Sequence, residues 1–354
     1  MKEKVALAVS GGIDSSTAAY TLKKAGYDVI GVNFEFWKWK KEKETELKNQ
    51  QLLKQTMKTI GVPLVTMNNA ELFKTRVVDQ FLYNLQAGGT PNPCVVCNPS
   101  VKFQLLKEFA DAEGIHLIST GHYARIINDM GVYKLLTGID SSKDQSYMLC
   151  YLNQEFLARL IFPLGATYKK QNVALMESIG LHVNEIEESQ DLCFIDPKHL
   201  KTFISNSVSE LNQPGNIVDN FGNQLGNHEG LIYYTIGQRK GIKVAAVQPY
   251  YVIRKNISDN ELVVGFLDEL GEKEFLVREL NWISSKPVFP LSCDVKIRYR
   301  SPATACTIMS EKENKIKVNL DEKIRDITPG QYAVFYEGDE LLGGGKIDSI
   351  EKKT

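Results

Sequence analysis

A short apolar strand that ends in a glycine pair constrains the fold of this chain more than any other feature. Residues 5–9 read VALAV, the stretch SGGIDSS follows at once, and residues 15–24 carry apolar side chains at helical spacing. Such a run predicts a strand buried in a parallel sheet. Glycine lets the backbone approach a ligand closely, and a helix N-terminus favours an anion. The junction therefore predicts a phosphate-binding loop.

The strand-then-helix pattern continues through the first half of the chain and changes near residue 214. Alternation of apolar runs with helix-forming stretches predicts a parallel sheet whose site lies at the carboxyl ends of its strands. Beyond residue 214, turn residues separate short strands, which predicts a small β-rich domain followed by a β-barrel. The strands expected are 29–34, 62–65, 116–120, 230–236, 250–254, 262–265, 293–299 and 332–336, and the longest helical stretch is 38–60. We expect an α/β domain over 1–200, a central β-rich domain over 201–267 and a C-terminal barrel over 268–354.

Composition limits the partners and the compartment. The chain has 354 residues with 42 Lys and Arg against 43 Asp and Glu, so its net charge of −1 gives no overall attraction to nucleic acid. Any RNA site must be a local patch. No apolar run reaches the length of a signal peptide or a membrane span, which predicts a cytoplasmic protein. Six cysteines are too few for a disulfide scaffold.

The glycine loop matches neither the dinucleotide fingerprint nor the triphosphate loop, whose lysine it lacks. Residues 10–15 instead resemble the pyrophosphate loop of the ATP pyrophosphatase superfamily, whose members adenylate a substrate and release pyrophosphate. The resemblance implies ATP and Mg²⁺, with Asp14 helping to hold the metal; a simple helix cap made by Asp14 and Ser15 is the alternative. The ATP-binding residues implied are Ala8, Val9, Ser10, Gly11, Gly12, Ile13, Asp14, Ser15, Ser16, Phe34 and Gly121.

Two cysteines stand in an unusual stretch at 88–98, GGTPNPCVVCN. Its two glycines and two prolines predict a stiff loop without a regular helix, which presents Cys94 and Cys97. A third cysteine, Cys193, lies far downstream in ESQDLCF. Between them, the polar run at 140–147 could bind a substrate.

The whole order of motifs resembles the tRNA-specific 2-thiouridylase family. It runs SGGIDSS, TPNP, CN, TGHYAR, KDQSY, ESQDLCF, GLIYYTIGQRKG, KIRYR and GQYAVFYEGDELLGGG over nearly the full chain. The resemblance implies an N-terminal pyrophosphate-loop domain of the adenine nucleotide α hydrolase-like fold. It also implies that ATP adenylates the C2 oxygen of the wobble uridine, position 34, before sulfur replaces that oxygen. The expected partners are tRNAs for Lys, Glu and Gln and a sulfur-relay protein or cysteine desulfurase.

The resemblance also assigns roles to individual residues. Cys193 would carry a persulfide, and Cys97 would be the attacking or resolving thiol that releases the sulfur. Arg298 and Tyr299 in the barrel would contact tRNA, the first through phosphate and the second through stacking. Around the target base the implied tRNA contacts are Asn92, Pro93, the residue that follows them, Lys143, Asp144 and Gln145.

The chain departs from the family at Cys94, where the family usually has aspartate. The change creates a Cys94-x-x-Cys97 pair with Cys193 as a third thiol. Three converging cysteines can hold a [4Fe–4S] cluster with one iron open for sulfide. The sequence therefore leaves two sulfur routes open, a persulfide relay and a cluster. Zinc would need a fourth ligand, and Cys150 in an apolar stretch is expected in the core.

Two other functions compete with this reading. A different pyrophosphate-loop ligase would use SGGIDSS but would leave the three thiols and the β-rich tail without a role. A tRNA-binding or redox-sensing protein without enzymatic activity would need neither Asp14 nor both family cysteines. Release of AMP and pyrophosphate that depends on tRNA distinguishes the expected enzyme from both.

Overall fold

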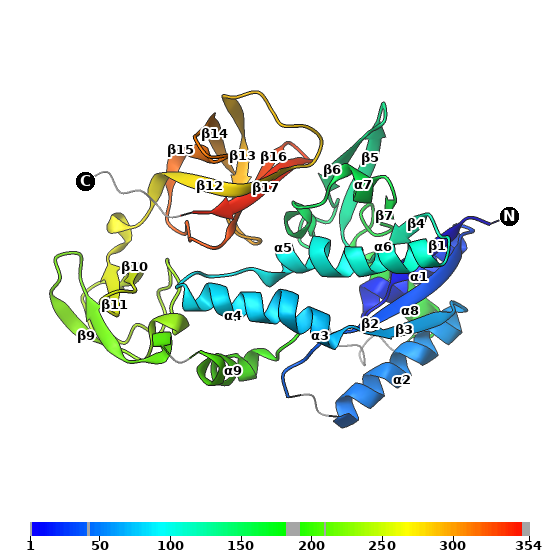
Figure 1. Ribbon diagram of the computed structural model, residues 1–354, viewed down its shortest axis with the longest axis horizontal. Coiled ribbons are helices and arrows are strands. Elements are labelled where there is room, and N and C mark those ends of the chain that lie inside the picture. Colours follow the sequence, from blue (N-terminus) through cyan, green and yellow to red (C-terminus); the bar gives the residue numbers. More distant parts are fainter. Residues whose placement is uncertain (1, 41–42, 182–191, 209, 349–354) are drawn as a thin grey trace.

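The first half of the chain forms the predicted parallel sheet (Figure 1). The computed structural model describes residues 2–40, 43–181, 192–208 and 210–348. Its five parallel strands stand in the order β3-β2-β1-β4-β7. Since β2 and β4 flank β1 on opposite sides, the strand order reverses at β1, and a crevice is expected beyond its carboxyl end. The strands are β1 Lys4–Ala8, β2 Asp28–Glu35, β3 Leu64–Asn68, β4 Leu117–Ser119 and β7 Leu160–Ile161.

Helices cover both faces of this sheet. Along β1, Ala6 packs into one apolar cluster with Phe103, whereas Val5 and Leu7 pack into another with Leu22. The alternation of side chains along a strand sends neighbours to opposite faces, so a run that is apolar throughout must be covered twice. The helices are α1 Ile13–Lys24, α2 Lys43–Ile60, α3 Ala70–Phe73, α4 Asp79–Gln86, α5 Pro93–Cys97, α6 Phe103–Ala112, α7 Gln154–Leu157 and α8 Lys169–Ser178.

The stretch around the first two cysteines is helical, so the prediction of an irregular loop over 88–98 is wrong for its second half. Helix α5 begins at Pro93 and continues through a π-helical turn, Asn98–Lys102, into α6. Proline is compatible with the first helical position because it has no N–H to leave unpaired there. Asn92 caps the helix by accepting a hydrogen bond from the Cys94 amide at 3.2 Å.

The second β-rich part contains a four-stranded sheet in the order β10-β11-β8-β9. The strand expected at 230–236 is absent there; a single 3-10 turn, Leu231–Tyr233, takes its place. Leu231 and Ile232 are both buried, a pattern that an alternating strand cannot give. The elements of this part are helix α9 Leu200–Ser207 and strands β8 Gly215–Val218, β9 Gln224–His228, β10 Tyr251–Asn256 and β11 Glu261–Gly265.

The last part is a six-stranded barrel, which confirms that prediction. Strands follow the order β12-β15-β14-β13-β16-β17, and a pairing of β12 with β17 closes the ring. A hairpin from the first half, β5 Ala124–Asp129 and β6 Val132–Thr137, extends the barrel sheet by pairing with β17 (Figure 1). The barrel strands are β12 Glu272–Trp282, β13 Leu291–Lys296, β14 Thr304–Ser310, β15 Ile316–Ile324, β16 Tyr332–Glu337 and β17 Glu340–Ile347. None of the helices described is both long and apolar enough to cross a membrane.

Candidate active site

The glycine loop lies at the carboxyl end of β1 and leads directly into α1. Gly11 has φ +87°, a left-handed conformation that favours glycine, and Gly12 is the N-cap of α1 without a side-chain cap. Ser15 Oγ accepts from the Ser10 amide at 3.2 Å, and the hydroxyls of Ser15 and Ser16 donate to the Gly12 carbonyl at 3.0 Å. The hydroxyl residues therefore hold the loop, and the alternative of a simple helix cap made by Asp14 and Ser15 is not what forms.

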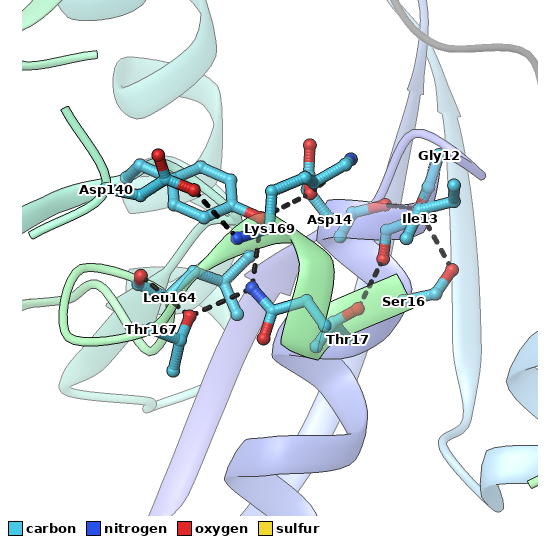
Figure 2. A network of polar contacts seen from close by, with 12 residues as sticks. Gly12, Ile13, Asp14, Ser16, Thr17, Asp140, Leu164, Thr167 and Lys169 are labelled. Atoms are coloured by element: carbon cyan, nitrogen blue, oxygen red, sulfur yellow. Dashed lines mark hydrogen bonds and ion pairs between the residues drawn. The ribbon is translucent and has the colours of Figure 1, made fainter. Parts of the chain in front are cut away.

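The Asp14 carboxylate is the centre of a polar network (Figure 2). Its Oδ1 accepts from Lys169 Nζ at 2.7 Å and from the Tyr123 hydroxyl at 2.8 Å. Asn172 in turn donates to the Tyr123 hydroxyl at 3.0 Å. Burial is the main cause that raises the pKa of Tyr123, and the charge of Asp14 acts in the same direction, so the phenol keeps its proton. The loop carboxylate is thus held by two donors.

Lys169 is a site residue that sequence reasoning missed. It is the first residue of α8, and its side chain is only 12% exposed. Its amide donates to Asp140 Oδ2 at 2.9 Å, which fixes the start of the helix. Hydrogen bonds from Ser142 and from this amide lower the pKa of Asp140. The loop therefore has its lysine after all, but it arrives from a helix 155 residues further along the chain.

The predicted nucleotide residues outside the loop lie at the carboxyl ends of the strands that flank β1. A Cβ on Gly121 would come within 2.9 Å of the Asp14 carbonyl carbon and the Ser15 amide, so only glycine fits this approach. Phe34 lies near the carboxyl end of β2, half-buried. His122 is buried, and its Nδ1 lies 2.7 Å from Thr120 Oγ1. Burial, with the charge of Lys102, lowers the pKa of His122 well below its usual value, so its ring stays neutral.

The thiols lie in apolar surroundings. Cys97 is buried and belongs to the same apolar cluster as Phe194, the neighbour of Cys193. Burial raises the pKa of Cys97 to about 12, the charge of Lys102 opposes this, and the nearby thiols of Cys193 and Cys94 add to it. Cys193 is exposed as a residue, yet desolvation of its sulfur raises its pKa, against the charges of Lys102 and Lys38. Residues 188–191 of the ESQDLCF stretch lie outside the described residues.

A [4Fe–4S] cluster would need Cys94, Cys97 and Cys193 as its ligands. Throughout the described parts of the chain, no three Cys, His, Asp or Glu side chains gather closely enough to hold a metal. Burial raises the pKa of both Cys97 and Cys193, so each would have to lose its proton as iron binds. The three side chains as described therefore do not form a ready-made cluster site.

Two tryptophan residues contact the segment that carries Cys193. The Trp39 amide donates to the Phe194 carbonyl at 2.8 Å, and its ring lies 5.0 Å from that of Phe203. The Trp37 ring lies 6.4 Å from the Phe194 ring. Trp37 and Trp39 are therefore part of the apolar packing around the cysteine segment.

Two segments predicted to contact tRNA meet beside the thiols. Asn92 donates to the Met148 sulfur at 3.6 Å, and Asn98 donates to the Met148 carbonyl at 2.9 Å. These contacts seat α5 on the 3-10 turn Ser146–Leu149, which directly follows the segment 143–145 in the chain.

Within that segment, two side chains make internal hydrogen bonds. Asp144 is buried and accepts from the amides of Gly138 and Ser146 at 3.0 and 3.1 Å. Gln145 accepts from the Tyr123 amide at 3.1 Å, and its own amide donates to the Tyr123 carbonyl at 2.9 Å. Lys143 is half-buried at the start of the segment. The segment thus ties the thiol side of the site to the Asp14 network through Tyr123.

The predicted barrel pair lies away from the loop. Arg298 donates to the Ile236 carbonyl at 3.0 Å and to Thr328 Oγ1 at 2.6 Å, which ties the barrel to the middle part of the chain. Burial lowers the pKa of Arg298. Tyr299 is half-buried, with its ring 6.2 Å from that of Tyr147.

Family models match the chain in three consecutive pieces. Residues 3–197 match the tRNA methyl transferase HUP domain, 201–266 the tRNA methyl transferase PRC-barrel domain, and 272–347 the aminomethyltransferase β-barrel domain. The parallel sheet with its phosphate loop and the two β-rich parts thus define a HUP-domain protein of the tRNA-modifying class.

Relatives that match this chain over its full length show which family of tRNA-modifying proteins it belongs to. The chain is 38% identical to the tRNA-specific 2-thiouridylase MnmA of Geotalea uraniireducens, over 100% of this chain and 97% of the relative. It is 40% identical to MnmA 2 of Clostridium tetani, over 98% and 99%. The chain belongs to the tRNA-specific 2-thiouridylase family. Among solved structures, the U34-tRNA thiolase NcsA from Methanococcus maripaludis with its [4Fe-4S] cluster matches at 16% identity and TM-score 0.36, over 58% of this chain and 65% of that one.

Proposed function

We infer that the chain is a tRNA 2-thiouridylase, an ATP-dependent sulfurtransferase that converts the C2 oxygen of uridine 34 to sulfur. Membership of the family carries this conclusion, since the relatives match over the full length. The site supports it because a loop suited to phosphate and a pair of thiols lie in one domain, linked through Tyr123 and the segment 143–145. We expect tRNAs for Lys, Glu and Gln as substrates in the cytoplasm.

Adenylation is the step that the loop performs. The amides of Gly11 and Gly12 and the hydroxyl of Ser10 bind the phosphates of ATP, and Lys169 neutralises their charge. Mg²⁺ that accompanies ATP would be held by Asp14, a hard oxygen ligand, and would stabilise the leaving pyrophosphate. The uridine O2 attacks the α-phosphorus, the bond to the β-phosphate oxygen breaks, and pyrophosphate leaves. The C2 carbon then carries AMP, a good leaving group.

Sulfur transfer is the step that the thiols perform. A sulfur-relay protein or a cysteine desulfurase places a persulfide on Cys193, whose exposure suits delivery by another protein. The terminal sulfur attacks C2, and AMP leaves with the bonding electrons. Cys97 then attacks the Cys193 sulfur, which frees 2-thiouridine and leaves a Cys97–Cys193 disulfide. A thiol reductant restores both cysteines for the next turnover. Cys94 has no required part in this sequence.

The test is a reconstituted reaction. Purified protein, unmodified tRNA transcript for Lys, ATP and a persulfide donor should together give 2-thiouridine at position 34, measured by mass spectrometry of the digested tRNA. AMP and pyrophosphate should form only when tRNA is present. Release of AMP without tRNA would support a different pyrophosphate-loop ligase, and tRNA binding without any AMP would support a binding protein.

A further inference from the structure

A cavity of about 470 Å³ lies where the three parts of the chain meet. The turn at 87–89 after α4 forms one wall and strand β10 forms another. Barrel residues at 324–330 and 346–348 form the third wall. A volume of this size accommodates a group as large as one nucleotide. None of the roles assigned above uses it.

The cavity carries an excess of positive charge. Five cationic side chains line it against three acidic ones, although the chain as a whole is balanced. It is therefore the kind of local patch that a neutral protein needs if it is to bind RNA. The cations are Arg254, Lys255, Arg278, Arg325 and Lys346, and the acids are Glu269, Glu272 and Asp348.

Most of these cations are already paired. Arg278 contacts Glu279 and Asp348, Lys346 donates to Asn84 Oδ1 at 2.9 Å, and Arg325 lies 3.6 Å from an Asp326 oxygen. An anionic ligand would have to displace these partners before it could pair with Arg278, Lys346 or Arg325.

Lys255 differs from the other four. Within the described residues its ammonium has neither an ion-pair partner nor a side-chain hydrogen bond, and burial alone lowers its pKa to about 8. A half-buried, unpaired ammonium costs free energy, which an anion in the cavity would recover.

The cavity adjoins the predicted target-base loop. A smaller depression lined by Asn92 and Pro93 shares Asn84, Gly330 and Lys346 with the cavity. We propose that the cavity binds a backbone phosphate of the tRNA next to the target nucleotide, with Lys255 as its principal ligand. This inference rests on the proposed function. Isoleucines at 236, 253 and 257 in the same walls suit the apolar face of the adjoining ribose or base.

The test compares two replacements of Lys255. Lys255→Met removes the charge and keeps the stem, whereas Lys255→Arg keeps the charge. Binding of tRNA is measured by fluorescence anisotropy across a salt series at pH 7. We expect Lys255→Met to weaken binding about tenfold at low salt and to reduce the slope of log Kd against log salt by about one. Lys255→Arg should stay near wild type, as should the control Lys312→Met, at an exposed lysine that does not line the cavity.

Chemical labelling gives a second readout. Acetylation by a water-soluble N-hydroxysuccinimide ester at pH 8 should modify Lys255 readily, and tRNA should protect it while ATP or inorganic phosphate should not. Equal protection by inorganic phosphate would overturn the RNA assignment. Lys255→Met removes an unpaired half-buried charge, so it should fold at least as stably as wild type. If wild type binds and thiolates tRNA but Lys255→Met has the same Kd and slope, the cavity inference fails alone; if wild type binds no tRNA, the proposed function fails first.

Discussion

The glycine loop at 10–16 and the apolar surroundings of Cys97, here called the thiol pocket, differ in the charge of their side chains. The Asp14 carboxylate already has Lys169 and Tyr123 as donors. Cys97 lies in an apolar cluster, where burial raises its pKa to about 12 and keeps it a neutral thiol. One region is organised for a charged ligand before that ligand arrives, and the other keeps its nucleophile inactive. A neutral Cys97 is a weak nucleophile, because the thiolate is the reactive form.

The largest effect is expected at the sulfur carrier. Cys193→Ser should reduce 2-thiouridine formation by at least about a thousandfold, because a hydroxyl cannot carry a persulfide. AMP and pyrophosphate should still form with tRNA, since the loop is intact. Thiolation is followed by mass spectrometry and pyrophosphate by a coupled enzyme assay. Cys293→Ser in the barrel is the matched control. Loss of pyrophosphate release in Cys193→Ser would show that adenylation at the loop depends on the thiols.

The next effect is expected at the loop. Asp14→Asn keeps the shape and removes the charge, and should slow pyrophosphate release about 100-fold or more while tRNA affinity changes less than about twofold. Lys169→Met should also slow it. The double variant should lose less than the sum of the two single losses, because the residues are paired at 2.7 Å. Full activity in Asp14→Asn would remove the loop from the reaction.

These two regions also differ in how far the sequence predicts them. The loop at 10–16 follows from a local signal, a buried strand that ends in two glycines and a helix, whereas Gly121, just after β4, is implied only by the family resemblance. Lys169 cannot be predicted from a local signal, because it meets Asp14 only when α8 packs against α1. The two residues are 155 positions apart in the chain. The pairing of Leu135 with Leu341 is equally out of reach, since it forms only when the barrel docks.

The cysteine stretch shows a different kind of error. A count of glycines and prolines predicts a loop over 88–98, yet the order of the residues carries the correct answer. Asn92 followed by Pro93 is a helix start, with a capping side chain and then a residue suited to the first turn. The apolar cluster that contains Cys97 draws on Phe81 and Phe194, which are distant in sequence. The start of the helix can therefore be predicted from the local sequence, whereas the raised pKa of Cys97 cannot.

A moderate effect is expected at Lys102, the cation that opposes the raised pKa of both thiols. A positive charge favours the thiolate, so Lys102→Met should raise the pKa of Cys97 and Cys193 further. At a given pH below that pKa, the thiolate fraction and the rate of alkylation by iodoacetamide should fall about threefold to tenfold.

The pH profile checks the sign of that effect. In wild type the alkylation rate of Cys97 should keep rising with pH beyond 10, because its pKa is about 12, and the Lys102→Met profile should lie to the right of it. Lys38→Met is a companion variant with a narrower effect, since the charge of Lys38 lowers the pKa of Cys193. A wild-type profile for Cys97 that levelled off near pH 7 would contradict the neutral thiol pocket.

The smallest effect is expected at Cys94, where the family resemblance implies an aspartate. Cys94 lies in the first turn of α5, half-buried, with its amide capped by Asn92. A carboxylate is stable at a helix N-terminus, so Cys94→Asp should fold normally. It should keep thiolation from a persulfide donor within about twofold, because the relay needs only Cys97 and Cys193.

Cys94→Asp also tests the cluster directly, since a carboxylate is a poorer ligand for iron than a thiolate. Iron content and visible absorption are measured on anaerobic wild type and Cys94→Asp, beside thiolation from inorganic sulfide and from a persulfide. Iron in wild type that disappears together with all activity in Cys94→Asp would replace the relay by a cluster. The neutral pocket would then describe only the metal-free protein. Iron-free wild type, with persulfide-driven activity that survives the change, would leave Cys97 and Cys193 as the two thiols of a persulfide relay.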